Sequence, residues 1–378
     1  MTRISQERIA QQLKISRATV SRSLANHPSV SAETRAAVHR LAESLGYQVT
    51  PGRGPRRRRG SKPYTIGVVI GVPAANGQPA ASVGMATFPQ ILKGIHGRAE
   101  ADRIAVDVCY ENPATFDADS PRLSVFRQIR AANWRGAILI YPFPDRAVQV
   151  LAEKISLVTI LEDYSHLNLD SIDVDNAAGI ECLVQLLAER GHRRIGFAAW
   201  HYTVGGHWAY RRFGGYAEAV FRAGLEFSPD WVINIHRNAP CRANSLDIAR
   251  EVARLVREHR VTAWVCAADH QAYHLIQDLR SLGLNVPADC SVTGFDGIEP
   301  PLGQAQVTSV RVPTEEIGES AVARLVSRLV TPRAPYRKIL VEADLIPGVT
   351  VAPPPPAPAQ PLPPPSSSSR KPARSSGP

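Results

Sequence analysis

The chain has 378 residues, which is long enough for a substantial core and for more than one domain. No run of about 18 apolar residues occurs and the N-terminus lacks an apolar secretory segment, so a spanning helix and a signal peptide are not expected. The five cysteines are scattered without a C-x-x-C pair, which is typical of a protein in a reducing cytosol.

The net charge of +10 is distributed unevenly along the sequence. Residues 1–62 contain 13 Lys and Arg against 3 Asp and Glu, residues 63–350 contain 28 against 31, and residues 351–378 contain 3 against none. A strongly basic module therefore precedes a nearly neutral body. This distribution predicts that the N-terminal module binds a polyanion and that the body has a separate role.

Three short helices are expected within residues 1–46. Ser5, Ser16 and Ser31 stand where helix N-caps are favoured. Apolar residues recur at helical spacing and should face inward: Ile9, Ala10, Leu13, Val20, Leu24, Val38, Leu41 and Leu45. Two helices joined by a tight turn and followed by a third predict a helix-turn-helix unit.

The second of these helices has an outer face of arginines and small hydroxyl residues. Arginine forms bidentate hydrogen bonds with guanine in the major groove, and hydroxyl groups suit phosphate oxygens. We predict that this helix and its ends contact DNA through Ser16, Arg17, Ala18, Thr19, Ser21, Arg22 and Asn26. An ordinary surface helix with solvated arginines is the alternative.

From Tyr64 onward, apolar strands alternate with helical segments. We expect strands at residues 65–72, 105–110, 137–141, 157–161, 171–175, 195–200, 263–267 and 291–295. Helices are expected between many of them, at residues 88–102, 177–190, 210–223, 245–259 and 271–282. This alternation predicts an α/β fold with parallel sheets covered on both faces, and the length favours two lobes. The Pro- and Ser-rich residues 352–378 are expected to be disordered.

These segments carry a resemblance to a known family. The stretch ISQERIAQQLKISRATVSRSLANHPSVSAETRAAVHRLAESLGY resembles the DNA-binding headpiece of the lactose-repressor (LacI) family. In the body, IDVDNAAGIECLVQLLAERGHRRIGF, RRFGGYAEAVFRAGL and VCAADHQAYHLIQDLRSLGLNVPADCSVTGFD are similar to that family's effector-binding core. The resemblance extends over about residues 1–351.

The resemblance implies a helix-turn-helix headpiece at 1–47, a basic linker at 48–63 and a periplasmic-binding-protein-like core at 64–351. The core would consist of two doubly wound parallel sheets. Its first lobe is expected at about 64–165 plus 306–332, and its second at about 166–305 plus 333–351. The family also implies a homodimer in the bacterial cytosol, associated with the nucleoid and not with a membrane, that binds a pseudo-palindromic operator and needs no cofactor.

The resemblance also assigns effector-binding positions in the cleft between the lobes. They are Arg212, Asp296, Asp269 and Asp175, and we add Trp200 as a stacking wall for a sugar. All four family positions follow an expected strand or open a helix, where ligands bind in open α/β sheets. Each residue has another interpretation: Arg212 as a surface residue, Asp296 as a turn cap, Asp175 as a helix cap and Trp200 as core or rim.

The linker departs from the family pattern. The family usually has a hinge helix here whose leucine enters the minor groove, but PGRGPRRRRGSKP contains no leucine and its Gly and Pro disfavour a helix. We predict that Arg56, Arg57 and their neighbouring arginines contact phosphates or a narrow minor groove instead. A loose basic tether is the alternative. Lys14 replaces the usual turn glycine and should adopt a left-handed backbone at modest cost.

The predicted function is a DNA-binding transcriptional regulator, in this family most often a repressor, controlled by a small-molecule effector that is a sugar or sugar derivative by family default. An enzyme on a doubly wound fold is the alternative, but the sequence lacks G-x-x-x-x-G-K-[ST], G-x-S-x-G and a G-x-G-x-x-G after the first strand. A non-specific architectural DNA binder is a third class, which would leave the large neutral body unexplained. His270 and His274 have metal-ligand spacing but no third ligand, so we expect no metal site.

Overall fold

The computed structural model describes residues 6–24, 30–44, 64–72, 74–75, 78–79, 87–116, 124–201, 207–235 and 244–356. The predictions for Ser5, Asn26, Leu45, Arg56 and Arg57 lie outside these residues, as does the linker. The chain divides into two compact units, one built mainly from Met1–Pro63 and one from Tyr64–Leu325 and Arg333–Pro378. Among the helices of the described ranges, none is long and apolar enough to cross a membrane.

The small unit, here called the headpiece, contains α1 (Gln6–Leu13), α2 (Arg17–Leu24) and α3 (Ala32–Ser44). Ile9, Val20 and Val38 are fully buried and meet at its centre, one from each helix. Ser16 and Ser31 cap α2 and α3, because their hydroxyl oxygens accept hydrogen bonds from the backbone N–H groups of the residues three positions on, at 3.0 and 3.2 Å. The three-helix pattern and both caps are therefore confirmed.

The turn between α1 and α2 is tight. Lys14 has φ of 52°, the left-handed conformation expected for this position, and is exposed. The backbone N–H of Ile15 donates to the carbonyl oxygen of Ala10 at 3.0 Å, which closes the end of α1. Such a closure is a common way to end a helix and to redirect the chain into the next one.

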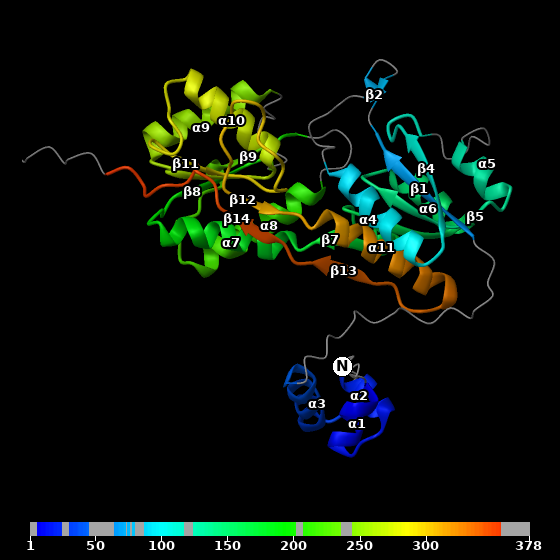
Figure 1. The fold of residues 1–378 in the computed structure, drawn as a ribbon. Helices are drawn as coiled ribbons and strands as arrows, with labels where there is room; N and C mark the ends of the chain where they lie inside the picture. Colours follow the sequence, from blue (N-terminus) through cyan, green and yellow to red (C-terminus); the bar gives the residue numbers. More distant parts are fainter. Residues whose placement is uncertain are drawn as a thin grey trace, which may run out of the picture. The chain divides into compact units, whose positions relative to one another are not determined.

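The large unit begins with a six-stranded sheet in which every neighbouring pair is parallel (Figure 1). The strand order is β13-β7-β6-β5-β1-β4. The strands are β1 (Thr65–Gly71), β4 (Ala105–Glu111), β5 (Trp134–Ile140), β6 (Ser156–Ile160), β7 (Asp170–Val174) and β13 (Lys338–Val341). A short hairpin, β2 (Ala74–Ala75) and β3 (Gln78–Pro79), follows β1.

Helices cover both faces of this sheet. On one face α4 (Phe88–Ala101) and α11 (Thr314–Val330) lie side by side (Figure 1). Their close approach needs glycine, because a Cβ at Gly94 would lie 2.0 Å from the carbonyl oxygen of Glu315. On the other face, α5 (Ser124–Arg130) and α6 (Asp145–Lys154) pack into a core with Phe143 and Tyr164. A 3-10 turn, Ser165–Leu167, precedes β7.

The second sheet has four parallel strands in the order β11-β10-β8-β9. They are β8 (Ile195–Ala198), β9 (Val232–Ile233), β10 (Ala263–Cys266) and β11 (Ser291–Thr293), and a 3-10 turn at Pro229–Trp231 precedes β9. α9 (Ser245–His259) and α10 (Asp269–Ser281) cover one face (Figure 1). α7 (Asn176–Glu189) and α8 (His207–Arg222) cover the other (Figure 1). The predicted class, two doubly wound parallel sheets, is confirmed.

Three connections join the two sheets. β7 runs directly into α7, residues 294–313 lead from β11 to α11, and residues 342–350 lead from β13 back to the second sheet. Within the last two, β12 (Ser309–Arg311) and β14 (Asp344–Ile346) pair antiparallel. At these connections the chain passes between the two sheets.

The predicted lobe boundaries need correction. Residues 166–174 and 333–341 were expected in the second lobe, but β7 and β13 are strands of the first sheet. Only Asp175 separates β7 from α7, so no turn-rich segment marks the point at which the chain changes lobes.

The start of the predicted disordered tail is also part of the fold. The carbonyl oxygen of Ala352 lies 2.8 Å from Nε2 of His192, and Arg260 donates to the carbonyl oxygens of Pro355 and Pro356 at 3.1 and 2.9 Å. A proline-rich segment lacks N–H donors, yet its carbonyl oxygens can still accept hydrogen bonds from side chains. Residues 352–356 are therefore attached to the second lobe, and residues 357–378 lie outside the described ranges.

Candidate functional site

The first candidate site is the outer surface of α2. Arg17 and Arg22 are both exposed, and Ser16 and Thr19 stand at its N-terminus with their hydroxyl oxygens 2.8 Å apart. Arg17 lies 3.8 Å from Glu7 of α1, with both side chains about two-thirds exposed at 69% and 65%. An exposed ion pair of this kind is weak in water. The guanidinium groups of Arg17 and Arg22 therefore both remain available to an anionic partner.

The remaining predicted DNA contacts are less defined. The structure does not describe the side chains of Ala18 and Ser21, although both residues belong to α2. The N-terminus of α2 also exposes backbone N–H groups, of which Ser16 satisfies one. Helix N-termini and exposed arginines together suit the phosphates and base edges of a nucleic acid.

The second candidate site lies where the strands of the second sheet end, around Arg212 of α8. The Arg212 side chain is only 6% exposed, and its Nε donates to Asn176 Oδ1 at 2.8 Å and its Nη1 to the carbonyl oxygen of Ala267. Nη2 lies 3.0 Å from Oδ1 of Asp296. Two of the four residues that the family resemblance placed in the cleft, Arg212 and Asp296, are thus in direct contact.

Aromatic rings flank the same guanidinium group. Its central carbon lies 3.8 Å from the ring centroid of Phe295 and 4.7 Å from that of Trp208. Cation–π contacts of this kind stabilise a buried arginine without consuming its N–H donors. The guanidinium is therefore held by two aromatic rings on its faces and by one polar contact from each of its three nitrogens.

Asp296 occupies an unusual backbone position directly after the buried Phe295. Its φ is 123°, which non-glycine residues rarely adopt, and its side chain is 19% exposed. Burial raises the pKa of Asp296, and the neighbouring Arg212 charge opposes that shift. The carboxylate is thus a partly accessible acceptor beside a rigid donor.

Asp269 has a different environment from the one predicted. It is fully buried, Oδ1 accepts a hydrogen bond from Ser309 Oγ, and Oδ2 accepts from the backbone N–H of Ile298 at 2.9 Å. Both partners belong to the connection between β11 and α11. Asp269 therefore anchors this connection to the start of α10, and its effector contact stays a prediction.

Asp175 and Trp200 also have structural contacts. Asp175 caps α7, because its Oδ1 accepts a hydrogen bond from the backbone N–H of Ala178 at 3.0 Å. The Trp200 ring packs edge-on against His270, with ring centroids 5.0 Å apart, and lies 5.3 Å from His274. Their effector contacts remain predictions, whereas the alternative interpretation of Asp175 as a helix cap describes its observed contact.

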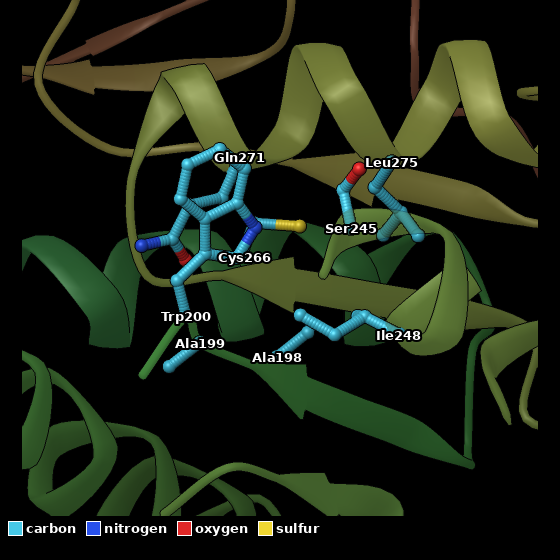
Figure 2. A pocket seen from close by; sticks show the side chains of 8 residues that line it. All are labelled: Ala198, Ala199, Trp200, Ser245, Ile248, Cys266, Gln271 and Leu275. Carbon is cyan, nitrogen blue, oxygen red and sulfur yellow. The ribbon is translucent and has the colours of Figure 1, made fainter. Parts of the chain in front are cut away.

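A small pocket lies beside Trp200 at the ends of β8 and β10 (Figure 2). Trp200 and Gln271 lie on one side of it and Ser245, Ile248 and Leu275 on the other (Figure 2). The space inside it amounts to only about 10 Å³, which is roughly what one water molecule needs. The pocket is therefore at most one part of a larger binding cleft.

Sequence reasoning missed several residues of this site. Asn176 and Phe295 contact Arg212, and Tyr141 directly follows β5 of the first sheet. Burial raises the pKa of Tyr141 to about 12, and its hydroxyl oxygen lies 2.8 Å from that of Thr87. Asn176 and Phe295 directly adjoin Asp175 and Asp296, so the same motifs contained the missing contacts.

The histidines on α10 do not form a metal site in the described residues. His270 is buried, and this burial lowers its pKa to about 4. No group of three or more His, Cys, Asp or Glu side chains within the described ranges could hold a metal ion.

Comparisons with known proteins match both units. Residues 7–49 match the sequence profile of bacterial regulatory proteins of the lacI family, and residues 184–351 match that of a periplasmic binding protein-like domain. The ribose operon repressor of Haemophilus influenzae is 26% identical over 342 residues, which cover 88% of this chain and 94% of that protein. The transcriptional repressor CytR of Escherichia coli is 26% identical over 352 residues, covering 89% and 93%.

Solved structures share the fold along most of the chain. The lac repressor dimer bound to operator and the anti-inducer ONPF has a TM-score of 0.59 and 21% identity, covering 93% of this chain and all of that one. A complex of the transcriptional regulator CelR with cellobiose has a TM-score of 0.57 and 24% identity, covering 92% and 100%. With its helix-turn-helix headpiece and its two-sheet core joined in one chain, the protein belongs to the lacI family of bacterial regulatory proteins.

Proposed function

We propose that the protein is a transcriptional repressor that binds an operator as a homodimer and changes its operator affinity when a sugar or sugar derivative binds in the cleft of its core. The observation that carries this proposal is the presence of two separate recognition surfaces in one chain. α2 exposes Arg17 and Arg22, and the core holds the Arg212–Asp296 pair at its strand ends.

The headpiece would insert α2 into the major groove, with arginines at base edges and the helix N-terminus at a phosphate. Two headpieces of a dimer read half-sites about one DNA turn apart, so the operator should be pseudo-palindromic. The basic residues Arg56 and Arg57 would add phosphate contacts that steepen the salt dependence of binding.

The core would recognise hydroxyl groups. A hydroxyl both donates and accepts hydrogen bonds, and the cleft offers a rigid guanidinium beside a partly accessible carboxylate. Trp200 and Trp208 supply aromatic surface near this pair, which suits the apolar face of a sugar ring. The H. influenzae relative is named for the ribose operon, and one structural neighbour is a cellobiose complex, which supports a sugar as the effector class.

The core would respond to its ligand without converting it. An effector that contacts both lobes favours the closed arrangement by its differential affinity, and this shift is transmitted to the headpieces. We infer that the chain acts in the cytosol at DNA and is not an enzyme, because lacI-family proteins are DNA-binding regulators.

Selection of fragments from the host genome by the full-length protein tests the DNA-binding part. A bounded, pseudo-palindromic footprint supports the proposal, whereas uniform protection along the DNA would favour an architectural role. Thermal-shift measurements with ribose, cellobiose and a panel of other sugars test the effector part. Arg212→Ala should abolish any stabilisation found, and a retained shift would contradict the assignment of the cleft.

A further inference from the structure

We propose that Arg211 is a positioning residue that holds the two lobes together by bridging Glu162 and Asp173 across the cleft. This inference rests on the proposed function, because lobe closure is the property that an effector would change. It concerns a side chain next to Arg212 that is not among the predicted effector-binding positions.

The first lobe supplies two buried carboxylates. Glu162 follows β6 and its side chain is 1% exposed, while Asp173 belongs to β7 and its side chain is 2% exposed. Burial raises the pKa of both groups, and Arg211 is the largest opposing influence on each. Carboxylates that have lost their water need a nearby positive charge to remain ionised.

The second lobe supplies that positive charge from α8. Nη2 of Arg211 lies 3.3 Å from Asp173 Oδ2 and 3.6 Å from Glu162 Oε1. His207, one turn earlier on α8, places its Nδ1 3.0 Å from the same Glu162 oxygen. One helix of the second lobe thus contacts β7 and the segment that follows β6 in the first.

α8 is firmly part of the second lobe. Tyr216 donates its hydroxyl hydrogen to the carbonyl oxygen of Ile195 in β8 at 2.6 Å, and a Cβ at Gly215 would lie 2.8 Å from the Cα of Ala177 in α7. The Arg211 contacts therefore cannot follow the first lobe when the lobes separate. Opening the cleft would lengthen the bridge to Glu162, which follows β6 in the first lobe.

The bridge is incompletely satisfied in this arrangement. Glu162 Oε2 and Arg211 Nε are both buried and have no hydrogen-bond partner among the described residues. Unsatisfied buried groups offset part of the attraction between the charges. The bridge therefore favours closure only moderately, and a ligand hydroxyl that donates to Oε2 or accepts from Nε would strengthen it.

The adjacent carboxylate, Asp163, does not share this role. It lies 2.8 Å from Lys338 of β13, so its ion pair stays within the first lobe. The neighbouring residues Glu162 and Asp163 thus contact different partners, and Glu162 is paired with α8.

The experiment measures the distance between the lobes in the full-length protein without DNA or effector. Spin labels at Glu153→Cys in α6 and Gln277→Cys in α10, both exposed positions, report the distance distribution after Cys109, Cys182 and Cys241 are replaced by serine. Labelled chains are diluted with unlabelled ones so that only distances within one chain contribute. The variants are Arg211→Met and Glu162→Gln.

Arg222→Met is the matched control. Arg222 lies on the same helix and also contacts two carboxylates, Glu181 at 3.1 Å and Glu218 at 3.0 Å, but both belong to the second lobe. Circular dichroism confirms that each variant remains folded. If Arg211→Met does not fold, Glu162→Gln tests the same bridge from the other lobe.

Both bridge variants should shift the ratio of open to closed molecules toward the open form by on the order of tenfold, and the double variant should add little to either. Arg222→Met should leave the distribution unchanged. Unaltered distances in Arg211→Met and Glu162→Gln would overturn the bridge, as would an equal shift in Arg222→Met. Because neither DNA nor effector is present, failure of operator selection would refute the proposed function without affecting this result.

Discussion

Replacing Arg212 with methionine should destabilise the core strongly, because the arginine is buried and has three hydrogen-bonding partners. The change removes the donors to Asn176 Oδ1, to the Ala267 carbonyl oxygen and to Asp296 Oδ1. It leaves the Asp296 carboxylate, whose side chain is 81% buried, without its counter-charge. Removing one partner of a buried ion pair typically costs about 3–5 kcal/mol.

The cost should depend on the charge left behind. In the double variant Arg212→Met/Asp296→Asn no charge is stranded, and asparagine tolerates the positive φ of 123° at position 296 better than most residues. We therefore expect the double variant to lose less stability than the sum of the two single variants. The coupling between the two positions should be at least about 1 kcal/mol.

Urea denaturation of the full-length protein, followed by circular dichroism, measures these differences. Arg222→Met is the control, because Arg222 is 61% exposed and an exposed pair contributes only about 0–1 kcal/mol. A loss for Arg212→Met no larger than that for Arg222→Met would show that the buried Arg212–Asp296 pair does not stabilise the core. Strict additivity of Arg212→Met and Asp296→Asn would do the same for the argument about the stranded charge.

Three further changes test the packing and the charges of the fold. Burial raises the pKa of Asp269 to about 7, above roughly 3.9 in an unfolded chain. Between these pH values the native state keeps a proton that the unfolded state loses, so the free energy of unfolding falls as pH rises. Asp269→Asn can still accept from Ile298 and donate to Ser309, so it should gain stability relative to the parent as pH rises from about 5 to 7; parallel pH profiles from urea denaturation would contradict this. Gly67→Ala should cost about 1–3 kcal/mol by overpacking, because its Cβ would lie 2.2 Å from the ring of Trp134, which Asp107 holds by a hydrogen bond; an unchanged melting temperature would disprove the clash. Ser31→Ala removes the α3 cap and should cost the headpiece about 1 kcal/mol, visible as faster amide exchange in α3 but not in α7.

Local patterns were sufficient for much of the fold. Ser16 and Ser31 mark helix starts because a hydroxyl cap acts within three residues, and the apolar runs that became β1 and β6 are buried on both faces. Connections between segments that are distant in the sequence were harder to predict. The passage from β7 to α7 needs only Asp175, so composition gave no indication that the chain changes lobes there.

In the candidate site, too, local motifs were predicted and long-range contacts were not. Arg212 and Asp296 were identified from their motifs, and the structure brings them into contact. Asp269 has the residue type of a ligand contact, but it anchors the β11–α11 connection through Ser309 and Ile298, which lie 40 and 29 residues away in sequence. The contacts of Arg211 with Glu162 likewise join segments that no local pattern relates.

The central claim is that the arginines of α2 select a DNA sequence. The most direct test compares affinities for the operator obtained by genomic selection and for a scrambled duplex, at one salt concentration, using Arg17→Ala, Arg22→Ala and the double variant. Arg40→Ala, an exposed arginine of α3, controls for the loss of one positive charge.

Each α2 substitution should reduce the free-energy preference for the operator by about 1–3 kcal/mol, which lowers the ratio of specific to non-specific affinity roughly 5- to 160-fold. Arg40→Ala should weaken both affinities similarly and leave that ratio nearly unchanged. If the variant that lacks both arginines keeps the ratio of the parent protein, α2 does not select the sequence and the proposed mode of operator recognition is wrong.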